Sequence, residues 1–248
     1  QLSVVVPVHN ERDNIVPLIE EIVAALRGRL ALEIVYVDDA SRDDSAAVLR
    51  EARTRFPELR VLRHLSQCGQ STAVRNGVKA ARCAWIATLD GDGQNDPAEI
   101  PKLLAARDAG EAVVKCYAGW RVDRRDDALK RMSSKVANAV RSRILRDATP
   151  DIGCGLKLFE REAFLELPYF DHMHRFLPAL VQAQGGMCVS VPVSHRPRLA
   201  GRSHYGVNNR LWVGLVDLVG VMWLRRRSRL PAPVDDTSPL QGGGGNKI

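Results

Sequence analysis

The chain has 248 residues, of which 45% are hydrophobic and 26% are charged. This composition is ordinary for one sizeable globular α/β domain and excludes a wholly disordered chain. A formal net charge of +7 favours an anionic partner such as a nucleotide or a phospholipid surface. Aromatic residues make up 5% and no recognised nucleic-acid motif occurs, which argues against a nucleic-acid partner.

The five cysteines form no C-x-x-C pair, which predicts reduced thiols in a cytoplasmic protein and disfavours a zinc site. The N-terminal apolar run is too short for a signal peptide and lacks a basic leader. The chain does not begin with Met, which indicates a trimmed start. No run of 18 apolar residues occurs, so we expect no transmembrane helix.

Strand-like apolar runs alternate with helical patterns along the first half of the chain. The predicted strands are 2–8, 33–37, 59–62, 85–89 and 112–117, and the predicted helices are 15–26, 45–55, 71–82 and 97–108. This alternation predicts a doubly wound, mostly parallel sheet flanked by helices. In such sheets ligands bind beyond the carboxyl ends of the strands. Polar residues that follow each strand are therefore the candidates for a site.

The second half has a different character. It contains a basic amphipathic helix at 128–145, strand-like segments at 151–159 and 189–193, and an apolar stretch at 211–224 that is followed by basic residues 225–229. The 14-residue apolar stretch is too short to span a bilayer, so it is either a buried core helix or a helix at the membrane interface. The predicted organisation is a main α/β domain at 1–207, an amphipathic, basic segment at 208–230 that would lie near a membrane, and a disordered tail at 231–248.

Two carboxylates leave the end of the run at 85–89. Asp90 and Asp92 are one residue apart, and Gly91 and Gly93 let the backbone bend so that both can be directed at one point. Hard oxygen ligands of this kind suit Mg²⁺ or Mn²⁺ held against the phosphates of a substrate. Taken alone, the same residues could form an ordinary surface turn.

Five motifs occur in an order that resembles a known family. They are residues 4–11, 37–43, 90–97, 119–121 and 201–205. With them the chain resembles the family 2 glycosyltransferases of the GT-A fold, and specifically the dolichol-phosphate and polyprenyl-phosphate sugar transferases. The resemblance covers roughly residues 1–225, and the motifs are specific together although none is specific alone.

The resemblance implies a nucleoside pocket lined by Pro7, His9, Glu11 and Asp39. A carboxylate at a strand end can accept hydrogen bonds from a base or a ribose, in agreement with this role. Asp38 and Asp39 could also cap the following helix, and we expect one to do so while the other binds the nucleotide. Relatives more often carry an aromatic residue where His9 stands, so the choice between GDP and UDP stays open.

The resemblance also implies the groups around the diphosphate. Asp90, Asp92 and Gln94 would hold the cation, with Asp90 and Asp92 also counted among the catalytic residues. The basic catalytic residues would be Arg121, Arg131 and Arg198, and the phosphate and loop residues would be Ser134, Arg202, Ser203 and His204. Arginine suits this task because its planar fork matches a phosphate with two hydrogen bonds. The choice between Arg196 and Arg198 stays open.

The implied activity is a metal-dependent, inverting transfer of mannose or a related sugar from a nucleotide sugar to undecaprenyl or dolichyl phosphate. The acceptor phosphate is already anionic at neutral pH, so no protein nucleophile is required. Such a protein would associate peripherally with the inner face of the membrane, and the resemblance favours an amphipathic interfacial helix for the C-terminal apolar stretch at 211–224. Two alternatives remain: transfer to a saccharide hydroxyl, with Asp126, Asp127 or Asp151 as the base, or a catalytically weak nucleotide-sugar-binding protein. The oligomeric state is not predicted.

Overall fold

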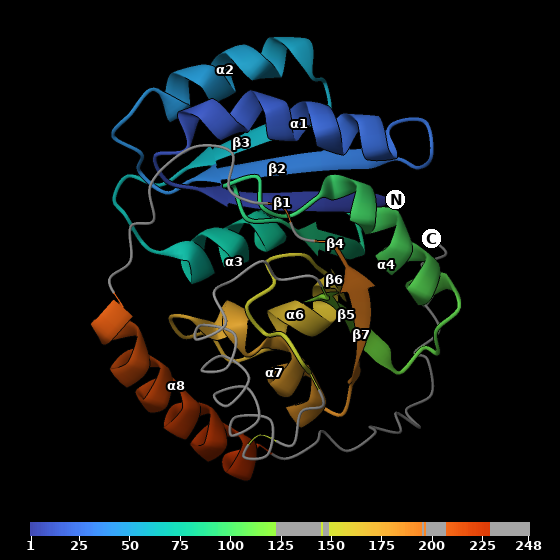
Figure 1. Ribbon diagram of the computed structural model, residues 1–248, viewed down its shortest axis with the longest axis vertical. Coiled ribbons are helices and arrows are strands. Elements are labelled where there is room, and N and C mark those ends of the chain that lie inside the picture. Colours follow the sequence, from blue (N-terminus) through green and yellow to red (C-terminus); the bar gives the residue numbers. More distant parts are fainter. Residues whose placement is uncertain (123–144, 146–148, 195, 197–206, 229–248) are drawn as a thin grey trace, which may run out of the picture.

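One seven-stranded sheet organises the chain in the computed structural model, which describes residues 1–122, 145, 149–194, 196 and 207–228 (Figure 1). The strands are β1 (Leu2–Val8), β2 (Leu32–Asp38), β3 (Leu59–Arg63), β4 (Trp85–Thr88), β5 (Val114–Arg121), β6 (Lys157–Glu160) and β7 (Met187–Val193). Their order in the sheet is β3-β2-β1-β4-β6-β5-β7. All neighbours run parallel except β6, which is antiparallel to both β4 and β5.

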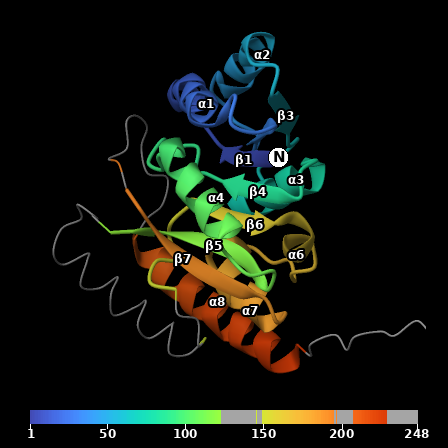
Figure 2. The ribbon, with the colours of Figure 1, turned by 90° about the vertical axis from the view of Figure 1, so that its right-hand side faces the viewer.

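Helices cover both faces of this sheet. They are α1 (Arg12–Leu26), α2 (Ser45–Arg55), α3 (Gln70–Ala80), α4 (Ile100–Asp108), α6 (Arg161–Leu165), α7 (Leu177–Ala183) and α8 (Val207–Arg227), with single 3₁₀ turns at η1 (Pro97–Glu99) and η2 (Met173–Arg175). The helices α1, α2 and α4 lie on one face, and α3, α6 and α7 lie on the other (Figures 1 and 2). The predicted α/β/α architecture is therefore confirmed.

The pleat of β1 divides its side chains between two cores. Val4 and Val6 pack with α1 in one apolar cluster, whereas Val5 packs with α3 in the other. All seven residues of β1 are buried. A strand that is apolar on both faces is typical of a sheet covered by helices on both sides, and this explains the unbroken apolar run at its position in the sequence.

The second half departs from expectation in its details. The strand expected at 151–159 begins only at Lys157, and it runs antiparallel to its neighbours. The short helices α6 and α7 were not predicted. Of the basic helix expected at 128–145, the structure describes only Leu145, and the tail 231–248 lies outside the described residues. The domain division stays a prediction.

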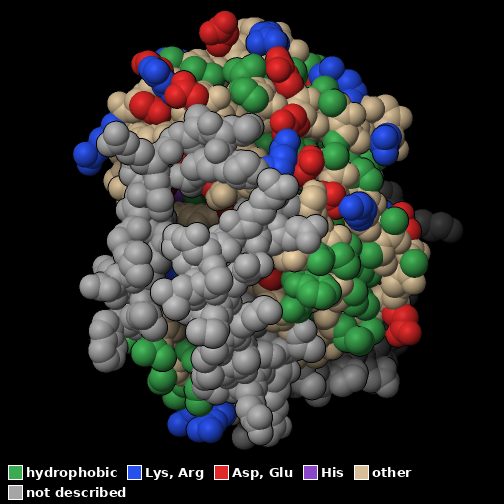
Figure 3. Space-filling view, in the orientation of Figure 1, with side chains coloured by type: hydrophobic (Ala, Val, Ile, Leu, Met, Phe, Trp, Pro, Cys, Tyr) green, Lys and Arg blue, Asp and Glu red, His purple; other side chains and the backbone are tan. Residues whose placement is uncertain are grey.

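Helix α8 is longer than the predicted stretch, and apolar side chains lie on two sides of it. Leu218 and Val221 are buried, and α8 contacts α7. On the solvent side, Val216, Val219 and Trp223 are each more than half exposed. Figure 3 shows hydrophobic side chains over α8 and basic side chains at its C-terminal end. Among the described residues, none of the helices combines the length and hydropathy needed to cross a membrane.

Candidate functional site

The predicted site residues gather at one edge of the sheet because β1, β2 and β4 are parallel. Asp39 follows β2, Asp90 follows β4 after one residue, and His9 follows β1 directly. The carboxyl ends of parallel strands share an edge, so residues 30 to 81 positions apart in the chain come to the same edge. The structure therefore brings these residues to one edge of the sheet, and their roles in a site stay a prediction.

The carboxylate of Asp90 lies in a tight recess of this edge. The Nε2 group of Gln70 donates to its Oδ1 at 2.8 Å, and the Asp90 N–H donates to Oδ1 of Asn95 at 3.2 Å. A Cβ atom on Gly155 would stand 2.2 Å from Oδ2 of Asp90. Any side chain at position 155 would therefore displace this carboxylate, which explains the glycine in physical terms.

Two effects raise the pKa of Asp90 above its ordinary value. Burial is the larger, and the negative charge of Asp92 adds to it, while Lys157, Gln70 and Arg121 oppose them. When Asp90 ionises, nearby positive groups compensate its negative charge only in part. A divalent cation would supply the missing positive charge, so the donor set of Asp90 and Asp92 fits a bound cation.

The turn that carries Asp92 and Gln94 is shaped by its own side chains. Oδ1 of Asp92 accepts the Gln94 N–H at 3.1 Å, and Gly93 between them has a φ of 72°. The Gln94 carbonyl accepts the Arg196 N–H at 3.1 Å, which fixes the chain beyond β7 beside this turn. Both Asp92 and Gln94 keep partial solvent exposure, so their oxygen atoms are accessible to a ligand.

The guanidinium of Arg196 is directed at helix α1. Its Nη1 and Nη2 groups donate to the two carboxylate oxygens of Glu21 at 3.1 and 2.6 Å. That fork is therefore not presented to a phosphate, which disfavours Arg196 for the phosphate role. Six predicted residues lie outside the described part of the chain, and their roles stay predictions: Arg131, Ser134, Arg198, Arg202, Ser203 and His204.

Arg121 forms a buried two-point ion pair instead of presenting its whole fork to the site. Its Nε and Nη2 groups donate to the carboxylate of Asp151 at 2.6 and 2.9 Å, and the two side chains are only 12% and 5% exposed. Burial alone would lower the pKa of Arg121, but its hydrogen bond and charge interaction with Asp151 raise it above the ordinary value. Asp151 is committed to this pair, which disfavours it as a general base.

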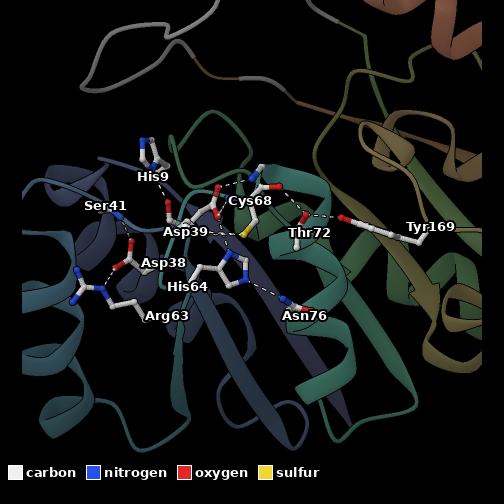
Figure 4. Close-up of polar contacts among 12 residues, drawn as sticks. His9, Asp38, Asp39, Ser41, Arg63, His64, Cys68, Thr72, Asn76 and Tyr169 are labelled. Atoms are coloured by element: carbon white, nitrogen blue, oxygen red, sulfur yellow. Dashed lines mark hydrogen bonds and ion pairs between the residues drawn. The ribbon is translucent and has the colours of Figure 1, made fainter.

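His9 and Asp39, two of the four residues predicted for the nucleoside pocket, adjoin each other where β1 and β2 end (Figure 4). His9 donates from Nδ1 to the Asp39 carbonyl at 2.8 Å, which places the ring beside the β2 end. The Glu11 carboxylate accepts from the side chain of Asn14 at 2.7 Å. Pro7 is at the end of β1 and also lines a cavity that contains Asp90, so it connects the two parts of the edge.

The expectation that Asp38 or Asp39 caps the next helix is wrong. The residue at the cap position of α2 is Asp44, and Oδ1 of Asp38 accepts the Ser41 N–H at 2.9 Å within the preceding turn. Asp39 binds a different segment: it accepts from the N–H groups of Cys68 and Gly69, both at 2.8 Å. Neither carboxylate therefore caps the N-terminus of α2, because a six-residue connection separates β2 from the helix.

Several residues of the site were missed by sequence reasoning. They line the cavity beside Asp90: Gln70 of α3, Gly155 in the segment before β6, Lys157 of β6 and His174 of η2. Lys157 is buried and donates from Nζ to the Ile152 and Cys154 carbonyls. Burial holds the pKa of His174 well below its ordinary value. The position of Gln70 just after a glycine, at the start of the helix that follows the third strand, was the available signal.

Comparison with known proteins gives a consistent result. Residues 3–167 match the family described as Glycosyl transferase family 2. The dodecaprenyl-phosphate galacturonate synthase of Rhizobium johnstonii is 33% identical over 236 residues, which are 93% of this chain and 69% of that protein. The undecaprenyl-phosphate 4-deoxy-4-formamido-L-arabinose transferase of Edwardsiella ictaluri is 35% identical over 209 residues, which are 83% of this chain and 63% of that protein.

Solved structures share the fold at lower identity. A mannosyltransferase from Pyrobaculum calidifontis in complex with GDP-Man and Mn²⁺ has a TM-score of 0.66 and 18% identity, covering 94% of this chain and 65% of that one. Glucosyl-3-phosphoglycerate synthase from Mycobacterium tuberculosis in complex with Mg²⁺ and UDP has a TM-score of 0.68 and 17% identity, covering 94% and 80%. These likenesses establish the fold alone.

Proposed function

Because this chain belongs to glycosyl transferase family 2, we propose that it transfers a sugar from a nucleotide diphosphate sugar to a polyprenyl phosphate in a metal-dependent, inverting reaction. The observation that carries this proposal is the pair Asp90 and Asp92 at the carboxyl end of β4, with Gly155 leaving room for the first carboxylate. It stands beside the predicted nucleoside residues at the end of β1 and β2.

The acceptor class rests on the relatives. The names of both relatives described above specify a polyprenyl phosphate, whereas their sugars differ. The chain spans only 69% and 63% of the length of these two relatives, so the activity remains a proposal for this chain. The common element is the lipid phosphate, and the sugar is left open between mannose, a uronic acid and an aminosugar.

In this proposal Asp90, Asp92 and Gln94 hold Mg²⁺ or Mn²⁺. When bound, the cation neutralises the charge that builds on the departing nucleoside diphosphate. Burial and repulsion from Asp92 raise the pKa of Asp90. A bound cation would offset both effects and stabilise the ionised carboxylate. Gln70 keeps the Oδ1 atom of Asp90 in place. The neutral Gln94 would leave the cation more net positive charge to offer the diphosphate than a third carboxylate would.

The transfer itself needs no protein nucleophile. An oxygen of the acceptor phosphate attacks the anomeric carbon, and the bond from that carbon to the diphosphate oxygen breaks with both electrons going to the leaving group. One displacement of this kind inverts the anomeric centre. The protein contributes position and charge. A hydroxyl acceptor would need a general base, and the pairing of Asp151 with Arg121 disfavours one of the three candidates.

The finer proposal on location concerns α8. Its exposed apolar residues and the Arg225, Arg226 and Arg227 end give it the two attractions that hold a helix at an anionic membrane surface. A polyprenyl chain is insoluble in water, so its transferase must reach such a surface. We therefore propose peripheral association through α8.

The activity is tested by incubating the protein with UDP-linked and GDP-linked sugars, undecaprenyl phosphate and Mn²⁺, and by following labelled sugar into the lipid phase. We expect transfer from one nucleotide class, loss of transfer on chelation, and recovery with Mn²⁺ or Mg²⁺. Asp92→Asn is the matched negative control. Transfer that resists exhaustive chelation would contradict the metal-dependent mechanism, and transfer only to soluble saccharides would contradict the acceptor class.

The location is tested by flotation with anionic liposomes at low and high salt. The triple change of Arg225, Arg226 and Arg227 to Ser should weaken binding by about 1 kcal/mol for each charge that approaches the surface. It should slow transfer to long-chain polyprenyl phosphate more than transfer to a short soluble analogue. Unchanged flotation and equal effects on both acceptors would mean that α8 is a helix of the protein core.

A further inference from the structure

Three side chains of metal-binding type converge near the end of β2, away from the Asp90 recess. Asp39 follows β2, His64 follows β3, and Cys68 precedes α3. One ligand atom from each, a carboxylate oxygen, a ring nitrogen and a thiol sulfur, lies within 4.8 Å of the other two (Figure 4). We propose that these residues form a second cation site, which takes a thiophilic divalent ion such as Zn²⁺.

The donor set separates this site from the first one. Asp90, Asp92 and Gln94 offer oxygen alone, which suits Mg²⁺ or Mn²⁺. Asp39, His64 and Cys68 offer oxygen, nitrogen and sulfur, and thiolate with imidazole selects Zn²⁺ over the hard cations. Three protein ligands leave a fourth tetrahedral position for water. An open position of this kind is typical of an exchangeable ion rather than a structural one.

Small side-chain movements would bring the ligand atoms of Asp39, His64 and Cys68 to the separations that a bound Zn²⁺ requires. Nδ1 of His64 and Oδ1 of Asp39 are 2.7 Å apart, whereas two such donors on a tetrahedral Zn²⁺ are about 3.4 Å apart for bonds near 2.1 Å. Cys68 is exposed, and its thiol now bonds to the Ser66 carbonyl at 3.2 Å. The sulfur can therefore rotate toward Asp39 and His64, and the thiol proton leaves to solvent when the ion binds.

Asn76 supplies the outer support that a ligating histidine needs. Its side-chain nitrogen is 3.0 Å from Nε2 of His64, and because an amide nitrogen only donates, Nε2 accepts and Nδ1 carries the ring proton. On binding an ion at Nδ1, the proton moves to Nε2. A half-turn of the Asn76 amide then presents its oxygen as the acceptor. The ring stays neutral, and its orientation is kept.

The site has a functional consequence that rests on the proposed function. Asp39 is a predicted nucleoside ligand, and an ion on its carboxylate would occupy the oxygens that a base or ribose needs. Bound Zn²⁺ would also pull on the segment from Cys68 to Gly69, whose N–H groups now bind Asp39. We therefore infer that Zn²⁺ and the nucleotide compete, so that micromolar Zn²⁺ raises the KM of the nucleotide sugar.

The direct test uses Co²⁺ as a spectroscopic substitute for Zn²⁺ on the reduced full chain, with excess Mg²⁺ present to occupy the Asp90 site. A sulfur-to-cobalt charge-transfer band should appear, and one equivalent of Zn²⁺ should remove it. The band should be lost in Cys68→Ser and kept in Cys188→Ser, a matched control at a half-buried cysteine outside the cluster. Absence of the band in the unaltered protein, or its persistence in Cys68→Ser, would overturn the site.

A second variant tests the ligand atom of His64. Asn76→Asp provides a permanent acceptor for the Nε2 proton, so Co²⁺ should bind about tenfold more tightly. Equal or weaker binding would overturn the assignment of Nδ1 as the ligand. Finally, UDP or GDP with Mg²⁺ should displace the band, and a band that survives saturating nucleotide would overturn the competition. The Co²⁺ readouts do not depend on sugar transfer, so a failure of the proposed activity would leave this test decisive.

Discussion

Two carboxylates at the same edge of the sheet, one after β2 and one after β4, have opposite surroundings. The carboxylate of Asp39 receives backbone N–H donors from Cys68 and Gly69, and it also pairs with the ring of His64. The carboxylate of Asp90 receives the side chain of Gln70 but faces the charge of Asp92, and its pKa is raised. The same place in the topology therefore yields one carboxylate that organises a loop and another that needs a cation.

The largest effect that we expect is on turnover, and it tests whether the Asp90 carboxylate and its neighbour Asp92 bind a cation. Asp92→Asn removes a charge from the proposed cation site, and we expect turnover to fall about a hundredfold or more, since metal stabilisation of a leaving group contributes several kcal/mol. The melting temperature should change little. Steady-state kinetics at saturating Mn²⁺ gives the answer, with Asp108→Asn on exposed helix surface as control. Wild-type turnover in Asp92→Asn would mean that Asp92 only stabilises the turn in which it lies.

The contrast itself could be predicted only in part. The alternation of runs gave the correct order of strands and helices as far as β5, because each parallel strand is buried on both faces and each helix covers it. The site edge followed from that topology. The surroundings of Asp90 could not be predicted, because Gly155 packs against it from the segment just before the antiparallel strand β6. No local sequence pattern indicates that this strand runs in the opposite direction. The pairing of Arg121 with Asp151, 30 residues later, also could not be predicted from the spacing of residues in the sequence.

The next effect concerns the charge of Asp90. Its pKa is raised in the folded protein, so the folded state holds its proton more strongly than the unfolded chain does. The free energy of unfolding then falls as pH rises past the unfolded value of about 3.9, and the full cost is present above the folded value. Asp90→Asn removes that cost. The metal-free variant should melt above the unaltered protein at neutral pH, and this difference should vanish below about pH 4.

The same variant separates cation binding from folding. Mn²⁺ at about a hundred times its dissociation constant should add about 2.7 kcal/mol to the unfolding free energy of the unaltered protein and almost nothing to Asp90→Asn. Thermal unfolding with and without Mn²⁺, across pH, measures both effects. Equal stabilisation of the two proteins by Mn²⁺ would place the cation elsewhere, and a lower melting temperature for metal-free Asp90→Asn would show that its charge stabilises the fold.

A smaller effect is expected at Arg121, where the structure changes the expectation from sequence. A solvated phosphate-binding arginine could be replaced by lysine with little loss of stability. The buried pair with Asp151 predicts otherwise: Arg121→Lys gives up one of two charged hydrogen bonds, a loss of about 1.5 kcal/mol, or about 3 to 6 °C in melting temperature for a chain of this size. Arg82→Lys, on an exposed arginine 3.9 Å from Glu33, should change almost nothing. Equal melting temperatures for both variants would mean that the pair contributes little.

The smallest effect is expected at Ala40, next to Asp39, whose carboxylate already has hydrogen-bond partners within the protein. Ala40 has a φ of 55°, in the left-handed region, where a Cβ atom costs about 1 to 2 kcal/mol. Ala40→Gly removes that strain but adds flexibility to the unfolded chain, so we expect stability to rise by less than about 1 kcal/mol. Ala47→Gly inside α2 should instead lose about 1 kcal/mol. If Ala40→Gly raises the KM of the nucleotide sugar while the protein becomes more stable, the strain at this strand end serves to hold the Asp39 loop for its ligand. A lower melting temperature for Ala40→Gly would contradict the strain itself.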